Sequence, residues 1–147
     1  MHKVTLVTVG KVKSAWIKDG CDVYGDRLGH QCDFSEKILS AGSASEEHER
    51  ILASMEKTTG VFVALDETGK EKSSVELASW MGKQRDIGTP VTFLIGGAYG
   101  LSDAIRQKSS LVLSLSRMTL PHELCKLFFL EQLYRAHTIL AGTGYHH

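Results

Sequence analysis

A chain of 147 residues, 42% hydrophobic and 23% charged, has the size and composition of a single globular domain with one core. Its 17 basic and 17 acidic side chains balance to a formal net charge of +0, which disfavours, without excluding, nucleic-acid binding through bulk positive charge. No apolar run approaches the roughly 18 residues that a membrane span requires, and we expect one cytoplasmic domain over residues 1–147.

The cysteines and terminal histidines bear on metal binding and redox state. Cys21, Cys32 and Cys125 are odd in number and far apart, which fits reduced cytosolic thiols better than a disulfide framework or a zinc site. The adjacent His146 and His147 are typical of a terminal tail or tag rather than of a metal site. We therefore expect no metal.

The first half of the chain alternates strands with helices. Lys3–Val9 predicts a strand, because this opening run is only briefly apolar and lacks the cleavage site of a signal peptide. A helix over about 15–28 and a strand at Asp33–Leu39 follow, and residues 41–45 predict a loop. Ser45 is the expected cap of a helix over 46–57 that ends before Gly60. Residues 61–65 form a short apolar run typical of a central parallel strand.

The second half continues the alternation. Residues 66–70 predict a turn, and Ser73 or Ser74 opens a helix to about residue 85. A strand at Val91–Ile95, a short helix over 101–108 and a strand over 110–115 come next. Pro121 suits the first turn of a last helix that runs to about residue 140 and ends at Gly142. The pattern predicts an α/β fold, a three-layer sandwich around a mostly parallel sheet.

Two of these strands end at turns that could share one pocket. The segments are 94–101, which reads LIGGAYGL, and 113–122, which reads LSLSRMTLPH. Ligands of open α/β sheets bind outside the carboxyl ends of strands, and Gly96 and Gly97 leave the backbone free to approach one closely. The glycines do not match the dinucleotide-binding pattern, and Gly69-Lys70 lacks the other residues of a phosphate-binding loop.

The last helix is apolar on nearly all sides, which is typical of a buried helix. Glu131 and Arg135 are four residues apart and can pair on one face. Two interpretations stay open: a core helix with one surface salt bridge, or a helix shared with a second subunit that carries Arg135 toward a site. His122, at the helix start, could contact a substrate or merely hydrogen-bond the loop. Lys11, Lys13 and Lys18 form a small basic cluster whose simplest interpretation is a solvated face.

These residues together resemble the RlmH family, bacterial methyltransferases of the SPOUT class that modify 23S ribosomal RNA. The resemblance covers nearly the whole chain. It is carried by Val9-Gly10-Lys11, Leu65-Asp66 with Gly69-Lys70, Ile95-Gly96-Gly97 with Gly100-Leu101, Ser114-Leu115-Ser116 with Met118-Thr119, Pro121-His122, Glu131-Gln132 with Tyr134-Arg135-Ala136, and Tyr145-His146. The chain departs from the family in a shorter segment between the second strand and the second helix, and in ending on His147 where Lys or Arg is common.

The resemblance implies a C-terminal trefoil knot, which ordinary topology rules exclude, and S-adenosyl-L-methionine as cofactor. The matching cofactor-binding positions are Leu65, Gly97, Ser116, Arg117, Met118, Thr119, Leu120 and Pro121. The family acts as a homodimer on N3 of a pseudouridine in helix 69 of 23S rRNA, within the assembled 70S ribosome. We expect the same reaction here.

Catalytic and RNA-binding roles follow from that reaction. Transfer to N3 needs an aligned acceptor and removal of its proton, for which His122 is the best-placed base. Arg135 is the other candidate catalytic residue, and Tyr145 and His146 are expected to hold RNA. Two other interpretations stay open: a non-enzymatic module that binds adenosine nucleotides, and a dimeric scaffold without activity.

Overall fold

The computed structural model describes residues 1–147, which form five strands and five helices in alternation. The strands are β1 (Lys3–Val9), β2 (Asp33–Leu39), β3 (Val61–Glu71), β4 (Val91–Ile95) and β5 (Leu111–Ser114). The helices are α1 (Ala15–Gly29), α2 (Ala44–Glu56), α3 (Ser74–Asp86), α4 (Asp103–Lys108) and α5 (His122–Ala141).

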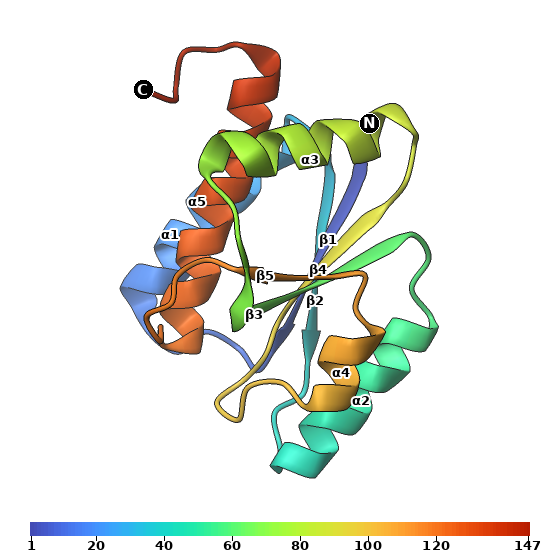
Figure 1. Cartoon of the computed structure of the whole chain (residues 1–147). Coiled ribbons are helices and arrows are strands. Elements are labelled where there is room, and N and C mark those ends of the chain that lie inside the picture. The colour runs from blue at the N-terminus through green and yellow to red at the C-terminus, as the bar shows by residue number, and fades with distance from the viewer.

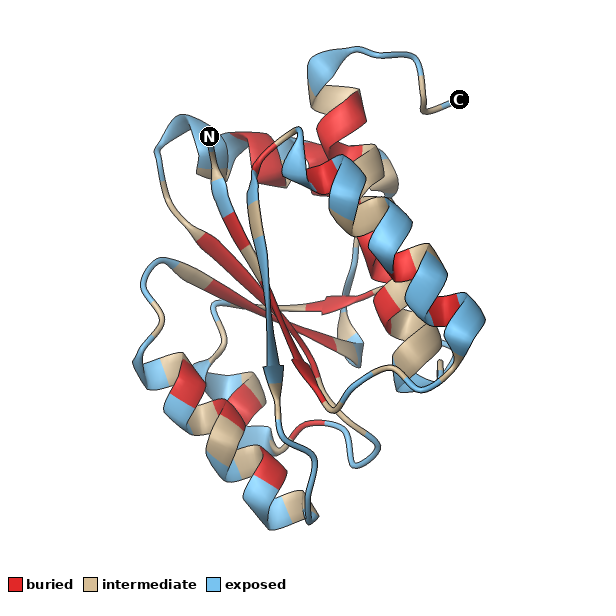
Figure 2. Cartoon of the chain, turned by 180° about the vertical axis from the view of Figure 1, so that it is seen from behind, coloured by how far each residue is buried: buried red, intermediate tan, exposed pale blue.

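The strands form one sheet in the order β2-β1-β4-β3-β5, with every neighbouring pair parallel. Helices α1, α3 and α5 cover one face of the sheet, and α2 and α4 cover the other, as Figures 1 and 2 show. The predicted three-layer α/β sandwich is confirmed. The trefoil knot stays a prediction.

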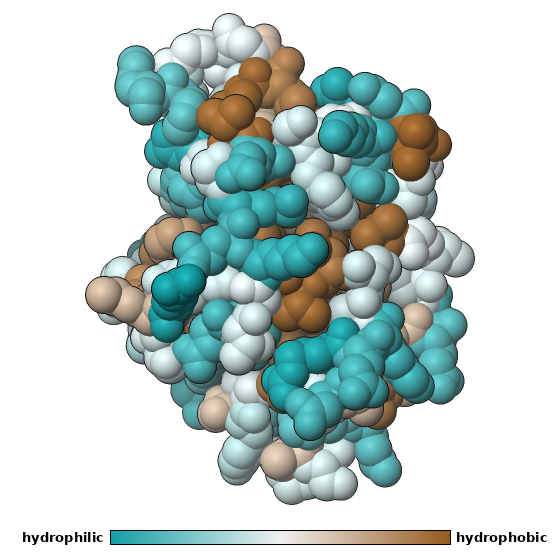
Figure 3. Space-filling view, viewed as in Figure 1, coloured by the Kyte–Doolittle hydropathy of each residue, from teal (hydrophilic) through white to brown (hydrophobic).

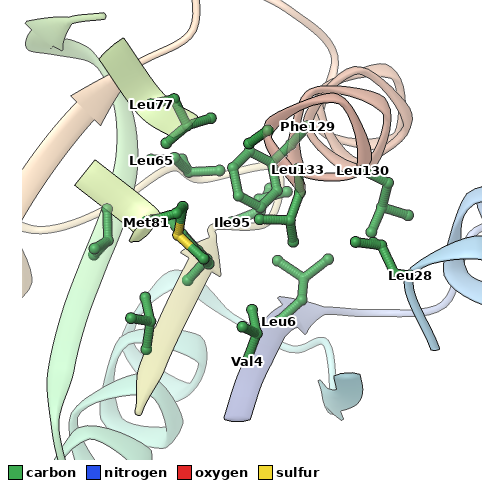
Figure 4. Close-up of a cluster of buried hydrophobic side chains, with 14 of the residues drawn as sticks. Val4, Leu6, Leu28, Leu65, Leu77, Met81, Ile95, Phe129, Leu130 and Leu133 are labelled. Carbon is green, nitrogen blue, oxygen red and sulfur yellow. The ribbon is translucent and has the colours of Figure 1, made fainter. Parts of the chain in front are cut away.

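The central strands bury side chains on both faces, as expected of strands between two helical layers. All five residues of β4 are buried, and alternate side chains enter two separate hydrophobic clusters. Phe93 faces the larger cluster, where its ring centroid lies 4.7 Å from that of Phe129 on α5. Figure 4 shows this cluster, with Leu6 of β1 and Leu133 of α5 also pointing into it.

Most of the apolar surface of α5 is used within the chain. The helix packs on the sheet between α1 and α3, and two glycines let those helices approach closely. A Cβ added at Gly20 would lie 2.8 Å from Leu127, and one added at Gly82 would lie 2.9 Å from Leu140. Burial against three neighbours therefore explains an apolar helix without a second subunit. Phe128 is left 41% exposed.

The sheet edge next to α5 is incompletely covered. Strand β5 lies at this edge, and its first two residues, Leu111 and Val112, are only half-buried. Figure 3 shows apolar side chains in the middle of one face of the molecule, over β3 and β5, framed by polar ones. This face has room for a further covering layer.

Three predicted boundaries are wrong. Ser43, not Ser45, caps α2, because Glu46 lies three residues after Ser43 and the two make a reciprocal capping box. Strand β3 continues through the predicted turn to Glu71, since the chain re-pairs with β5 beyond a register shift. The short helix α4 begins only at Asp103, after the cap Ser102.

Candidate functional site

A cavity of about 580 Å³ opens at the carboxyl ends of β4 and β5, where the sequence predicts a shared pocket. Its walls come from residues 65–67 at the register shift of β3, from the loops that follow β4 and β5, and from the first turn of α5. Seven of the eight predicted cofactor-binding residues line it: Leu65, Gly97, Ser116, Met118, Thr119, Leu120 and Pro121. Segments far apart in the sequence thus converge on one space.

The eighth predicted residue, Arg117, is placed elsewhere. It does not line the cavity, and its side chain is 88% exposed. Its Nε lies 2.8 Å from Oε1 of Glu71, at the end of β3. Arg117 is therefore positioned as part of the outer surface of the loop.

The glycine-rich loop after β4 forms a tight turn. The N–H of Gly100, with φ +67°, donates to the carbonyl of Gly97 at 3.0 Å. A Cβ at Gly96 would lie 2.9 Å from the Gly100 carbonyl oxygen, so only glycine fits there without a shift. Arg106 holds the turn from outside: its Nη1 donates to the Leu101 carbonyl at 2.7 Å and lies 3.8 Å from Asp66 Oδ1.

Glycine at position 97 also has a packing reason. The sequence predicts that Gly97 leaves the backbone free to approach a ligand. In the structure an added Cβ would lie 2.7 Å from Oε1 of Glu47 on α2 and 3.2 Å from the Val9 side chain. Glu47 is buried, and its other carboxylate oxygen accepts from the N–H of Gly42 at 3.0 Å. Gly97 lacks a side chain because the loop packs against a buried carboxylate.

The loop before α5 is ordered by its own hydroxyls. Ser114 Oγ donates to the Ser116 carbonyl at 2.9 Å, and Ser116 Oγ accepts from the N–H of Met118 at 3.0 Å. Thr119 Oγ1 donates to Oε2 of Glu67 at 2.6 Å, which joins the loop after β5 to β3. Met118, 78% exposed, lies at the tip of this loop.

The charges around the cavity limit what it can hold. Two carboxylates, Asp66 and Glu67, line it together with the imidazole of His122, and no lysine or arginine does. Much of the remaining wall is aliphatic, and Cys125 stays a neutral thiol because burial raises its pKa to about 11. Such a wall suits a flat apolar group with neutral or cationic substituents, and disfavours a phosphate ester.

His122 lies at the junction of two spaces. It lines the main cavity and also a small adjoining one, which Lys11 and the buried Lys126 line as well. The next residue, Glu123, accepts hydrogen bonds from the backbone N–H groups of Lys13 and Ser14 at 3.0 and 3.2 Å. These bonds lower the pKa of Glu123 and fasten the start of α5 to the loop after β1.

The other predicted catalytic and RNA-binding residues form a separate cluster. Arg135 Nε lies 2.7 Å from Glu131 Oε1, its Nη1 is 3.1 Å from His146 Nδ1, and its guanidinium lies 4.9 Å from the centroid of the Tyr145 ring. None of Arg135, Tyr145 and His146 lines the cavity. Arg135 lies in the second half of α5, and Tyr145 and His146 follow this helix, whose C-terminal end lies away from the carboxyl edge of the sheet (Figure 1). Within one chain the two groups of predicted residues are not brought together.

The sequence did not identify Cys125 and Glu67 among the residues that line the cavity. Cys125 is one helical turn from His122, so the i, i+3 spacing could have placed both on the cavity face. Glu67 lay within a predicted turn and gave no such signal. No group of three His, Cys, Asp or Glu side chains that could hold a metal ion occurs, and no helix is long and apolar enough to cross a membrane.

Comparison with known proteins assigns the chain to a family. The family model described as predicted SPOUT methyltransferase matches residues 2–146. A ribosomal RNA large subunit methyltransferase H of Geotalea daltonii is 42% identical over 99% of each chain. One of Maridesulfovibrio salexigens is 40% identical over 100% of this chain and 99% of its own.

Among solved structures, the SpoU methyltransferase AviRb of Streptomyces viridochromogenes, in complex with AdoMet, aligns with a TM-score of 0.47 at 18% identity. The alignment covers 91% of this chain and 57% of that one. The family assignment rests on the sequence matches, which span the whole chain and confirm the resemblance noted from its motifs. The chain belongs to the SPOUT methyltransferase family.

Proposed function

We propose that this protein transfers a methyl group from S-adenosyl-L-methionine to 23S ribosomal RNA. The observation that carries the proposal is the near-complete match to ribosomal RNA large subunit methyltransferases H, at about 40% identity over 99% of both chains. The cavity supports it, because seven residues singled out for the cofactor line one space.

The cavity fits S-adenosyl-L-methionine in size and chemistry. A volume of about 580 Å³ lies within the range of about 300–1,000 Å³ typical of small-molecule sites. Leu65 and Leu120 offer aliphatic surface to an adenine ring, and the turn at Gly97 offers backbone groups. The carboxylates of Asp66 and Glu67 suit ribose hydroxyls and a cationic ligand. When bound, this ligand supplies an electrophilic methyl group on a sulfonium sulfur.

His122 is the side chain at this cavity to which we assign proton removal. It lines the cavity and its ring makes no hydrogen bond within the chain, so it is free to meet an acceptor nucleotide. We place the acceptor at N3 of a pseudouridine in helix 69, whose proton His122 removes as methyl transfer proceeds. The remaining walls exclude water and align the two reactants.

We further propose a cytoplasmic homodimer that acts on the 70S ribosome. A groove of about 220 Å³ beside the edge strand, lined in part by Leu113, Leu115 and Phe128, gives a second subunit an apolar surface to cover. In a dimer, Arg135 of one subunit can lie near the cavity of the other. A net charge of +0 gives little long-range attraction for naked RNA, so recognition relies on local contacts and on the shape of the ribosome.

Two measurements test the cofactor and the reaction. Calorimetry with S-adenosyl-L-methionine, ATP and adenosine should give binding of the first well above the other two. Equal binding of all three, with no transfer, would support the nucleotide-binding module, and no binding of any would support the inactive scaffold.

Transfer to purified 70S ribosomes and to protein-free 23S rRNA, mapped by mass spectrometry, should occur almost only on ribosomes. His122→Ala and Arg135→Ala should each lower transfer while cofactor binding persists. Arg85→Ala, at an exposed position beyond the site, is the matched control. Equal transfer to free RNA would contradict the ribosome as substrate.

A further inference from the structure

Trp16 is the bulkiest side chain that the fold leaves in solvent. It is 65% exposed, contributes to neither hydrophobic cluster, and has no aromatic partner. Nothing in the packing of α1 requires an indole there, because Ile17 and Cys21 supply the buried side of the helix. The indole of Trp16 is therefore free to contact another molecule.

Two exposed lysines precede this indole in the segment that leads into α1. Lys11 and Lys13 are exposed, and neither makes an ion pair, whereas Lys18 is paired with Asp22 at 3.0 Å. The first turn of α1 carries no acidic residue. The nearby carboxylate of Glu123 accepts from the backbone N–H groups of Lys13 and Ser14 and keeps its negative charge, so two ammonium groups here face one carboxylate. The surface made of Lys11, Lys13 and Trp16 is therefore locally positive in a chain of zero net charge.

This surface is continuous with the cavity. Lys11 and His122 line the same small space, and two other residues of that space, Ile95 and Gly96, also line the cavity itself. The hydrogen bonds to Glu123 hold the loop before α1 against the start of α5. Figure 1 shows the loops into α1, α4 and α5 at the same end of the sheet. A molecule seated at the cavity mouth over His122 would extend onto Lys11.

We propose that Lys11, Lys13 and Trp16 form an RNA-contact surface for a nucleotide next to the one that is methylated. The indole stacks on an unpaired base, and the two ammonium groups contact the phosphates on either side. This inference rests on the proposed function and adds the part of the protein that holds the flanking strand. Exposed aromatic rings with neighbouring cations are the usual means of binding single-stranded RNA, whose bases are free to stack.

The experiment compares transfer kinetics on 70S ribosomes. Trp16→Ala should raise KM about tenfold, the scale of one lost stacking contact, with kcat at saturation little changed. Trp16→Phe should restore most of the lost affinity, because a ring that stacks remains. Ile87→Ala, at an apolar position 73% exposed, should leave KM unchanged.

The salt dependence of ribosome binding tests Lys11 and Lys13. Lys11→Gln and Lys13→Gln should each reduce the salt dependence of ribosome binding, by about 0.7 in the slope of log K against log salt. Lys57→Gln, an exposed lysine without an ion pair at the end of α2, is the control. Calorimetry with S-adenosyl-L-methionine and a melting curve should match the wild type for every variant.

The outcomes separate this inference from the proposed function. If the wild type methylates ribosomes and Trp16→Ala keeps its KM, the contact surface is refuted and the proposed function stands. If Trp16→Ala changes the oligomeric state, the indole belongs to an interface between copies and the inference is overturned. A wild type that methylates no ribosomal RNA overturns both.

Discussion

Adding one methyl group at Gly97 should destabilise the protein through a steric clash with neighbouring side chains. In Gly97→Ala the new Cβ would lie 2.7 Å from Oε1 of Glu47, where an ordinary C···O contact is about 3.3 Å or longer. The Val9 side chain, at 3.2 Å, crowds the same position. The carboxylate of Glu47 must shift, which strains its 3.0 Å bond from the N–H of Gly42.

The size of the effect follows from that geometry. Overpacking of this kind costs about 1–3 kcal/mol, and a loss of about 2 kcal/mol lowers Tm by roughly 6 °C in a domain of this length. Binding of S-adenosyl-L-methionine should weaken as well, because the displaced loop is a wall of the cavity. Thermal melting and calorimetry measure the two effects.

A double-mutant cycle with Glu47→Ala isolates the clash. In a protein that already carries Glu47→Ala, Gly97→Ala should lower the free energy of unfolding by at least about 1 kcal/mol less than it does in the wild type. A coupling of this size is typical of residues in contact. Independent, additive effects of the two substitutions, or a Gly97→Ala variant that melts with the wild type, would refute the packing argument.

Three further outcomes follow from the burial or exposure of particular side chains. Burial lowers the pKa of His137, so the unfolded chain binds more protons and stability should fall as the pH drops below about 6.5; His137→Gln should flatten this part of a Tm–pH curve. Glu36→Gln should cost more stability in denaturant melts than Lys126→Met, because it leaves the ammonium of a lysine 7% exposed without its 3.2 Å partner; equal costs would contradict this order. Phe128→Glu should dissociate a dimer in solution scattering yet leave a folded monomer, whereas Phe129→Glu, at a position 0% exposed, should fail to fold.

Much of the fold was predictable because the strong signals are local. The run at Val91–Ile95 is apolar at every position and bounded by turns, and Gly142 marks the end of the last helix with a left-handed C-cap. Where the boundaries were wrong, tertiary contacts had decided them. Residues 66–70 look like a turn in sequence, but Lys70 and Glu71 pair with β5, and Gly69 fits against the backbone of Val112.

Most residues that line the candidate site could be predicted from the sequence, but the contacts of individual side chains could not. The convergence of Leu65, Gly97 and Thr119 follows from parallel strands, whose carboxyl ends share one edge of the sheet. What the absent side chain of Gly97 would meet depends on Glu47 of another layer, which no local pattern reveals. The outward direction of Arg117 depends likewise on its partner Glu71.

The order of the strands has a consequence for how the chain folds. Strand β4 lies between β1 and β3, although both of these precede it along the chain. As the protein emerges from a ribosome, β1 and β3 have no direct partner in each other and wait until residues 91–95 appear to join them. Contacts such as Val4 with Val91 span most of the chain, and pairings of such separation fold slowly. Until then two apolar strands lack their central neighbour, and the unfinished protein is at its most prone to aggregation.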